Sequence, residues 1–239
     1  MTCKILGISG SPRHNSSTEV LIKEALDAAR EIDGIETEMI SLAGKRVLPC
    51  CGCYKCMENK GLCIFKDKDC LGEIYQKWFE ADGIIIASPV YHLSITGVLK
   101  NVLDRLGEGV WSLRANKVID SNWFGKVGGV ITQGMASFGG QEYTAQYLVN
   151  HLLLMNCLVV PPEFLTVPGV TGSFNGNKVF EGGKIAEYDE SAVINSRIMG
   201  RRVAEFAKIV KSGVAELNNE LPPEYRNYVL TKNGFQNIN

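Results

Sequence analysis

Residues 4–18 read KILGISGSPRHNSST, and this stretch decides the fold. Residues 4–9 are mainly apolar, as in a buried strand, and apolar residues recur at helical spacing from about Thr18 onward. Residues 9–18 hold five hydroxyl side chains and one arginine. A turn between a strand and a helix requires glycine, proline or Asx residues, but not so many hydrogen-bond donors. We therefore predict that this turn binds a ligand.

Apolar patterns along the rest of the chain predict alternating strands and helices. Strands are expected at 4–9, 35–42, 83–90 and 126–132, with a fifth starting at 157, and helices at 18–32, 69–82, 95–106, 140–156 and 190–211. Nearly uniform apolar strands are typical of a parallel sheet covered on both faces. With right-handed crossovers and a phosphate-type loop after the first strand, they favour a flavodoxin-like, doubly wound α/β fold, a five-stranded parallel sheet in the order 2-1-3-4-5.

The length of 239 residues favours one domain with elaborations. We expect a flavodoxin-like domain over 1–212, with a cysteine-rich insert at 45–70 after the second strand, and a C-terminal tail at 213–239. Residues 107–125 and 165–188 fall outside the predicted sheet and its helices. Together with the tail, they are interpreted as surface decoration or a dimer contact, and 165–188 alternatively as a hairpin or a lid.

Charge and hydropathy exclude several classes of protein. The formal net charge is −1 and no basic block is present, which argues against nucleic acid as the main partner. No apolar stretch approaches the roughly 20 residues needed to cross a bilayer. Residues 1–10 lack the charged start, apolar centre and cleavage site of a signal peptide. We therefore expect a cytoplasmic protein with no membrane partner.

The turn at residues 9–18 has the chemistry of a phosphate site. A helix N-terminus carries unpaired N–H groups and a partial positive charge, and both favour phosphate. The Walker pattern GxxxxGK[ST] and the dinucleotide pattern GxGxxG are absent, and Ser11 stands where the nucleophile pattern GxSxG needs glycine. A well-capped helix with spare serines is the alternative. The candidate donors are Ser9, Ser11, Arg13, Ser16, Ser17 and Thr18.

Two further loops should line the same crevice, because they follow the third and fourth strands at the same end of the sheet. They read SPVYHLS (88–94) and TQGMASFGGQE (132–142). Tyr91 and His92 offer flat groups for a ring, with core packing as the alternative for Tyr91. His92 is also a candidate proton donor, although a lone histidine is more often structural. The second loop offers backbone near Gly134, Gly139 and Gly140.

The eight cysteines are unusually clustered. In a reducing cytosol, such clustering indicates metal or redox chemistry before structural disulfides. Three cysteines at x2 spacing suit a cubane iron–sulfur core better than zinc, which usually takes two separated pairs, but zinc and no metal remain alternatives. Cys51 and Cys70 blur the assignment as substitute ligands, and Cys3 and Cys157 are expected in the core. The spacing C-x2-C-x2-C-x6-C joins Cys50, Cys53, Cys56 and Cys63.

Several of these motifs together resemble the flavodoxin-like, NADPH-dependent FMN reductases over roughly residues 3–160. They are SGSPR after the first strand, ADGIIIASPVY with LKNVLDR, and GGQE before a helix. The resemblance implies FMN, with its phosphate in the first turn and its ring along the other two loops. The implied FMN-binding residues are Ser9, Ser11, Pro12, Arg13, Asn15, Ser16, Ser17, Thr18, Pro89, Val90, Tyr91, His92, Thr132, Gln133, Gly134, Gly139 and Gly140.

The cysteine spacing is similar to that of the iron–sulfur flavoprotein branch of this family, which implies one [4Fe–4S] cluster held by Cys50, Cys53, Cys56 and Cys63. We hypothesise a redox flavoprotein that relays electrons from a one-electron, ferredoxin-like donor, or from NAD(P)H, to a two-electron small-molecule acceptor. A homodimer or homotetramer is expected. One alternative is an NAD(P)H-dependent FMN or quinone reductase without a cluster. Another is a non-catalytic binding module in which zinc holds the cysteine loop.

The topology also predicts where the cysteines lie. The segment after the second strand emerges at the same end of a parallel sheet as the phosphate loop, so we expect the cysteines on the flavin side, at an edge. Residues 45–70 hold six Lys/Arg against three acidic residues, a local charge of +3 that leaves −4 elsewhere. Such a charge favours an acidic donor such as a ferredoxin, with solvated loop charges as the alternative.

Overall fold

A parallel five-stranded sheet forms the centre of the computed structural model, which describes residues 1–116, 125–134, 139–161, 184–217 and 220. The strand order is β2-β1-β3-β4-β5, and every neighbouring pair is parallel. The predicted fold and strand order are therefore confirmed. The strands are β1 (Cys3–Ser9), β2 (Ile35–Ser41), β3 (Gly83–Pro89), β4 (Val127–Gln133) and β5 (Leu158–Val159).

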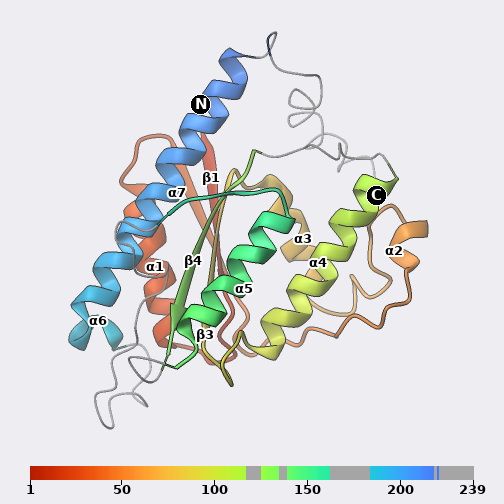
Figure 1. Cartoon of the computed structure of the whole chain (residues 1–239), viewed down its shortest axis with the longest axis horizontal. Helices are drawn as coiled ribbons and strands as arrows, with labels where there is room; N and C mark the ends of the chain where they lie inside the picture. Colours follow the sequence, from red (N-terminus) through yellow and green to blue (C-terminus); the bar gives the residue numbers. More distant parts are fainter. Residues whose placement is uncertain (117–124, 135–138, 162–183, 218–219, 221–239) are drawn as a thin grey trace.

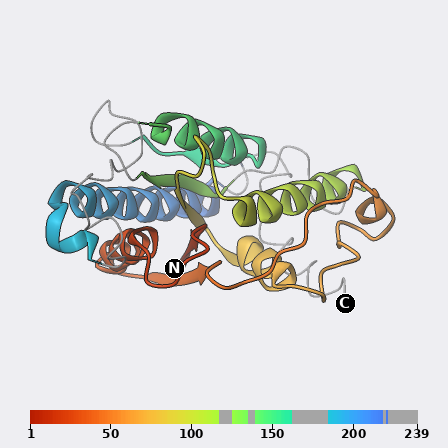
Figure 2. The same ribbon diagram turned by 90° about the horizontal axis from the view of Figure 1, so that it is seen from below.

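Helices cover both faces of the sheet, as the apolar strands require (Figures 1 and 2). One hydrophobic core packs β-strand side chains against α3 (Leu71–Glu80), α4 (Gly97–Ala115) and α5 (Gln141–Leu154). The other packs them against α1 (Ser17–Arg30) and α7 (Glu190–Glu216). Two four-residue helices complete the described elements, α2 (Lys55–Glu58) and α6 (Ile185–Tyr188).

The second core depends on a close approach of α1 and α7. A Cβ built at Gly200 of α7 would lie 1.9 Å from the carbonyl oxygen of Ala25 in α1, so only glycine fits there. Arg197 of α7 also donates a hydrogen bond to Glu24 of α1 at 3.1 Å. The C-terminal helix is therefore part of the flavodoxin-like layer and not an appendage to it.

Two helix ends differ from the sequence expectation by more than two residues. Helix α4 runs nine residues past the predicted end at 106, so residues 107–115 of the unassigned stretch 107–125 are helical. Helix α7 extends beyond 211 to Glu216. Within the stretch 165–188, the structure describes only 184–188, which contain helix α6. Residues 117–124, 162–183 and most of the tail lie outside the described residues, so the predicted hairpin or lid and the tail stay predictions.

The sheet places three loops at one edge. In a parallel sheet the carboxyl ends of all strands point the same way, so the loops after β1, β3 and β4 meet there. Strands β1, β3 and β4 end within one residue of their predicted ends, so the three loops begin where the sequence predicts. None of the helices described is both long and apolar enough to span a membrane.

Candidate functional site

The turn after β1 forms a capped helix start at the carboxyl end of the sheet. Ser16 is the N-cap of α1, and its side chain accepts a hydrogen bond from the Glu19 backbone N–H at 3.3 Å. Ser11 accepts a hydrogen bond from the Arg13 N–H at 3.2 Å. Asn15 takes a left-handed conformation with φ of 51°, which asparagine tolerates better than most residues. Pro12, Arg13 and Asn15 are exposed, so the turn opens to solvent.

Two hydroxyl groups of this turn are buried without a partner. Ser9 is fully buried and Thr18 is 1% exposed. Among the described residues, neither Ser9 Oγ nor Thr18 Oγ1 has a hydrogen-bond partner. Buried polar groups are nearly always hydrogen-bonded, so two unpaired hydroxyls at the two ends of this strand-to-helix turn indicate a ligand that accepts hydrogen bonds. Ser16 caps the helix by bonding to the Glu19 N–H, so helix capping does not explain the two unpaired hydroxyls.

The same turn packs directly on the next strand and its helix. Gly10 donates its N–H to the carbonyl oxygen of Ala87 in β3 at 2.7 Å, and Thr96, the N-cap of α4, donates its hydroxyl to the Gly10 carbonyl at 2.6 Å. A Cβ at Gly10 would lie 2.5 Å from Leu99 Cδ2. Glycine is therefore required for this approach, and it ties the loop to β3 and α4.

The loop after β3 lies against Gly140, in the described part of the loop after β4. Tyr91 and Ser94 exchange backbone hydrogen bonds at 2.8 and 3.1 Å, which closes a tight turn. A Cβ at Gly140 would lie 2.8 Å from Leu93 Cα. Tyr91 is 44% exposed, so the alternative of core packing does not hold for it. His92 is exposed beside it, with φ of 47°.

The remaining predicted flavin residues lie along the same edge. Val90 donates its N–H to the Gln133 carbonyl at 2.8 Å, and the buried Thr132 donates its hydroxyl to the Gln141 carbonyl at 3.3 Å. Gly134 is buried and Gly139 is exposed. The three loops thus bring the predicted residues to one edge of the sheet.

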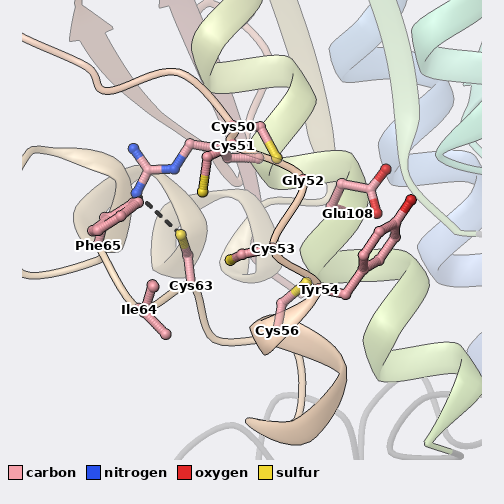
Figure 3. A pocket seen from close by; sticks show the side chains of 11 residues that line it. Cys50, Cys51, Gly52, Cys53, Tyr54, Cys56, Cys63, Ile64, Phe65 and Glu108 are labelled. Atoms are coloured by element: carbon pink, nitrogen blue, oxygen red, sulfur yellow. Dashed lines mark hydrogen bonds between the residues drawn. The ribbon is translucent and has the colours of Figure 1, made fainter.

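The cysteines form a second site. The four predicted cysteine ligands line one open pocket between the loop at 50–65 and helix α4 (Figure 3). Cys51 lines it too, and Figure 3 shows Cys51, Cys53 and Cys63 turned toward one another. Cys70 is not among the lining residues, whereas Cys3 and Cys157 lie in the two cores as expected. All eight cysteines are free thiols.

The thiols share a pocket without converging on a single point. Among the described residues, no three histidine, cysteine or acidic side chains are close enough together to hold one metal ion. Zinc would need four ligand atoms within about 2.3 Å of one centre, whereas the thiolates of a cubane bind separate irons and stand further apart. Clustered cysteine thiols are the donor type that an iron–sulfur core uses, and their arrangement here is not that of a closed zinc site. A hydrogen bond from the Lys55 backbone N–H lowers the pKa of the Cys53 thiol.

Polar side chains along one flank of α4 anchor the cysteine loop. Asn101 donates to the Val47 carbonyl at 2.9 Å. Arg105 donates to the Leu48 carbonyl at 3.1 Å and to Cys63 Sγ at 3.3 Å. Two helical turns beyond Arg105, Ser112 contacts Met57 Sδ at 3.2 Å, and Asn116, the C-cap of α4, donates to the Met57 carbonyl at 2.9 Å. Spacings of four and seven residues place these side chains on one side of the helix.

Two glycines bring the loop backbone against the same flank. A Cβ at Gly61 would lie 2.7 Å from the Gly109 carbonyl oxygen, and Gly61 has a φ of 85°. A Cβ at Gly109 would lie 2.6 Å from the Tyr75 hydroxyl. That hydroxyl donates to the Gly61 carbonyl at 3.2 Å. Helix and loop therefore touch backbone to backbone at this point.

The thiols lie further from the sheet edge than the topology predicts. The segment after β2 does begin at the edge, where Leu42 donates its N–H to the Ser9 carbonyl at 3.0 Å. It then runs along α4 (Figure 1). Arg105 and Glu108, which line the cysteine pocket, are roughly 12 Å or more along the helix from its first residue, at about 1.5 Å per residue. The cysteines are therefore on the flank of α4 and not at the carboxyl edge of the sheet. This edge, formed by the loops after β1, β3 and β4, is where the flavin is predicted, and it is called the flavin edge below.

Both sites lie within residues 3–172, which match a known protein family described as NADPH-dependent FMN reductase. The chain belongs to the NADPH-dependent FMN reductase family. An iron–sulfur flavoprotein of Methanocaldococcus jannaschii is 38% identical over 87% of this chain and 99% of that protein. One of Methanosarcina thermophila is 36% identical over 66% of this chain and 76% of that protein. A solved flavone reductase has a TM-score of 0.61 and 21% identity; the match covers 87% of this chain and 64% of that one.

Membership in the NADPH-dependent FMN reductase family makes the chain an oxidoreductase and bears out the resemblance seen in its motifs. The residues that the sequence analysis missed are those on α4, above all Arg105. Its side chain is 1% exposed and forms an ion pair with Asp69, whose side chain is fully buried. The sequence signal was present, because Asn101 and Arg105 are one helical turn apart within the family motif LKNVLDR.

Asp69 and Arg105 are both held charged by their surroundings. Burial raises the pKa of Asp69, but hydrogen bonds from the Leu48 N–H, Arg105 and the Leu71 N–H outweigh it and lower the pKa overall. Burial lowers the pKa of Arg105, but its contacts with Asp69 and Cys63 raise it overall. A buried pair of this kind is stable because each charge has several hydrogen-bond partners.

Proposed function

We propose that the chain is a redox flavoprotein that holds FMN at the carboxyl edge of the sheet and a [4Fe–4S] cluster in the cysteine pocket. In this proposal, electrons pass between a one-electron donor and a two-electron acceptor. The observation that carries it is the coexistence of two separate donor sets on one chain. One is a helix start with unpaired buried hydroxyls, and the other is a pocket lined by free thiols.

The residues of the β1 turn fit a phosphate ester. Ser9 and Thr18 supply buried hydroxyl donors without other partners among the described residues, and the exposed Arg13 supplies positive charge. Tyr91 and His92 lie beside the same edge, where a ring attached to that phosphate would be bound. His92 stays a candidate proton donor to such a ring. When bound, FMN supplies the exchange between one- and two-electron chemistry, and a cluster supplies single-electron transfer.

Charge supports an acidic electron donor, in the manner of a ferredoxin. Lys45 and Lys55 are paired with acidic side chains, at 3.5 Å from Glu73 and 2.9 Å from Glu58. In the described part of the chain, no ion pair involves the other four cations of the cysteine segment, which are Arg46, Lys60, Lys66 and Lys68. Unpaired cations around a redox site steer an acidic partner toward it.

The family description favours a second candidate, an NAD(P)H-dependent flavin or quinone reductase without a cluster. The proposal is tested by measuring flavin, iron and acid-labile sulfide in protein purified without oxygen. We expect about four irons and four sulfides per FMN. The variant Cys63→Ser should lose iron and keep FMN, and the control Cys3→Ala, at a buried strand cysteine, should keep both. FMN without iron would instead support the second candidate. Stoichiometric zinc in a colourless protein would support a binding module.

A further inference from the structure

Arg105 brings a buried positive charge into direct contact with one predicted ligand. Its Nη2 lies 3.3 Å from Cys63 Sγ, and its Nη1 donates to the Leu48 carbonyl at 3.1 Å and pairs with Asp69. The whole residue is 3% exposed. Its Nε is also buried and has no hydrogen-bond partner among the described residues, although the side chain lines the pocket.

Anchoring the loop does not require this charge. Asn101, Ser112 and Asn116 fasten the same loop to the same helix with neutral side chains, and none of them contacts a thiol in the described structure. Burying an ion pair usually contributes little to stability and often less than apolar packing would. The position of Arg105 against Cys63 thus calls for a role beyond attachment.

We propose that Arg105 is a positioning residue that orients Cys63 as a cluster ligand and raises the reduction potential of the cluster. This inference rests on the proposed function. One electron enters on reduction, no bond to Arg105 forms or breaks, and the guanidinium keeps its proton. An N–H···S hydrogen bond and a nearby positive charge both favour the state with the extra negative charge. Asp69 keeps the guanidinium in place while having no hydrogen bond of its own to a thiol in the described structure.

The experiment compares matched double variants of the full chain, purified without oxygen. Arg105→Met with Asp69→Asn removes the buried pair beside Cys63. Arg197→Met with Glu24→Gln removes a pair at 3.1 Å between α7 and α1, far from the cysteines. The reduction potential of the cluster is measured by a redox titration monitored by electron paramagnetic resonance. We expect the equilibrium constant for reduction of the cluster to fall about tenfold in the first variant. This corresponds to a reduction potential about 59 mV lower than that of wild type for one electron. The second variant should match wild type.

A third variant covers the case in which the first double variant does not fold, as judged by circular dichroism. Arg105→Lys keeps the charge, but an ammonium group paired with Asp69 cannot also reach Leu48 and Cys63, since it lacks the planar fork of arginine. We expect a potential shifted the same way by a smaller factor, about threefold.

The outcomes separate the two proposals. A wild-type protein without iron would refute the proposed cluster, and this inference with it. A cluster-bearing Arg105 variant with the wild-type potential would refute the inference alone and leave the proposed function standing. A folded variant that no longer loads iron, while the Arg197 variant does, would support the orienting role.

Discussion

The flavin edge and the cysteine loop are built in different ways. At the edge, backbone groups at the ends of paired strands set the geometry; Gly10 bonds to Ala87 of β3, and Val90 bonds to Gln133 of β4. In the cysteine loop, residues 42–70 contain one four-residue helix, and side chains of α4 hold the loop in place. The sheet defines the first region and a single helix flank defines the second.

This difference has a thermodynamic consequence. Removing a contact at the flavin edge disturbs strands that the whole domain shares, so its cost appears in global unfolding. The cysteine loop can leave α4 without breaking any strand pairing, so its cost is limited to the free energy of docking. The comparison therefore predicts that the two regions respond separately to substitution.

The largest expected effect separates two glycines of the same helix. In Gly109→Ala, the new Cβ meets the Tyr75 hydroxyl at 2.6 Å and the Gly61 carbonyl oxygen at 2.9 Å. Overpacking and loss of the Tyr75–Gly61 hydrogen bond should together destabilise loop docking by about 3 kcal/mol. In Gly107→Ala the Cβ meets nothing within 4 Å, so higher helix propensity should stabilise the helix by about 1 kcal/mol. Gly109→Ala should thus weaken loop docking, whereas Gly107→Ala should leave loop docking unchanged.

Native-state proteolysis by trypsin measures the free energy of loop docking in both variants, through cleavage at Lys55 and Lys60, which are exposed within the loop. Cleavage follows the population of the open form, so about 3 kcal/mol corresponds to roughly a hundredfold faster cleavage in Gly109→Ala. The urea midpoint of the sheet should move much less. Equal losses of loop protection and of global stability would show that the loop and the sheet unfold as one unit.

The arrangement of the three loops at the carboxyl edge of the sheet was largely predictable because it follows from chain order. Apolar strands predict a parallel sheet, a parallel sheet places its carboxyl ends together, and the residues after β1, β3 and β4 must then be neighbours. Ser9 and Thr18 were candidates on this ground alone, and their unpaired hydroxyls could be found only in the structure.

The cysteine loop was predictable in composition but not in position. The spacing of its thiols identifies a donor set, yet no strand or helix period tells a loop which surface to follow. The helix that holds it is predicted to end at 106, and glycines, which have low helix propensity, follow at 107 and 109. In the structure, Val110 and Leu113 are buried in the core and override that propensity, and Gly109 is needed for close contact. The roles of Ser112 and Asn116 lie beyond the predicted helix end.

The next largest expected effect concerns the helical layer of α3, α4 and α5, which supports both the flavin edge and the cysteine loop. His151 of α5 is 8% exposed, faces the Trp78 ring of α3 edge-on at 6.0 Å, and has a buried Nε2 without a partner among the described residues. Burial lowers its pKa from 6.5 to about 4. The unfolded chain therefore binds the proton first as the pH falls, so stability is lost between pH 6.5 and about 4, by about 3 kcal/mol in total.

Urea unfolding at a series of pH values measures this loss. His151→Leu should abolish the slope in that window, and His14→Gln, at an exposed side chain, should keep it. Because α3, α4 and α5 form one core, we expect acid to open the cysteine loop and the flavin edge together, unlike Gly109→Ala. A slope that survives in His151→Leu would assign the acid sensitivity to other groups.

The smallest expected effect tests the flavin edge by itself. Ser9 and Ser196 are both fully buried serines whose hydroxyls have no partner among the described residues, but Ser196 lies in α7. Ser9→Ala should weaken FMN binding about tenfold, since a hydrogen bond to a charged group contributes about 1.5 kcal/mol or more. It should leave riboflavin binding unchanged, because riboflavin lacks the phosphate. Ser196→Ala should change neither affinity. Titrations followed by flavin fluorescence measure all four, and equal weakening of both flavins by Ser9→Ala would place the phosphate elsewhere.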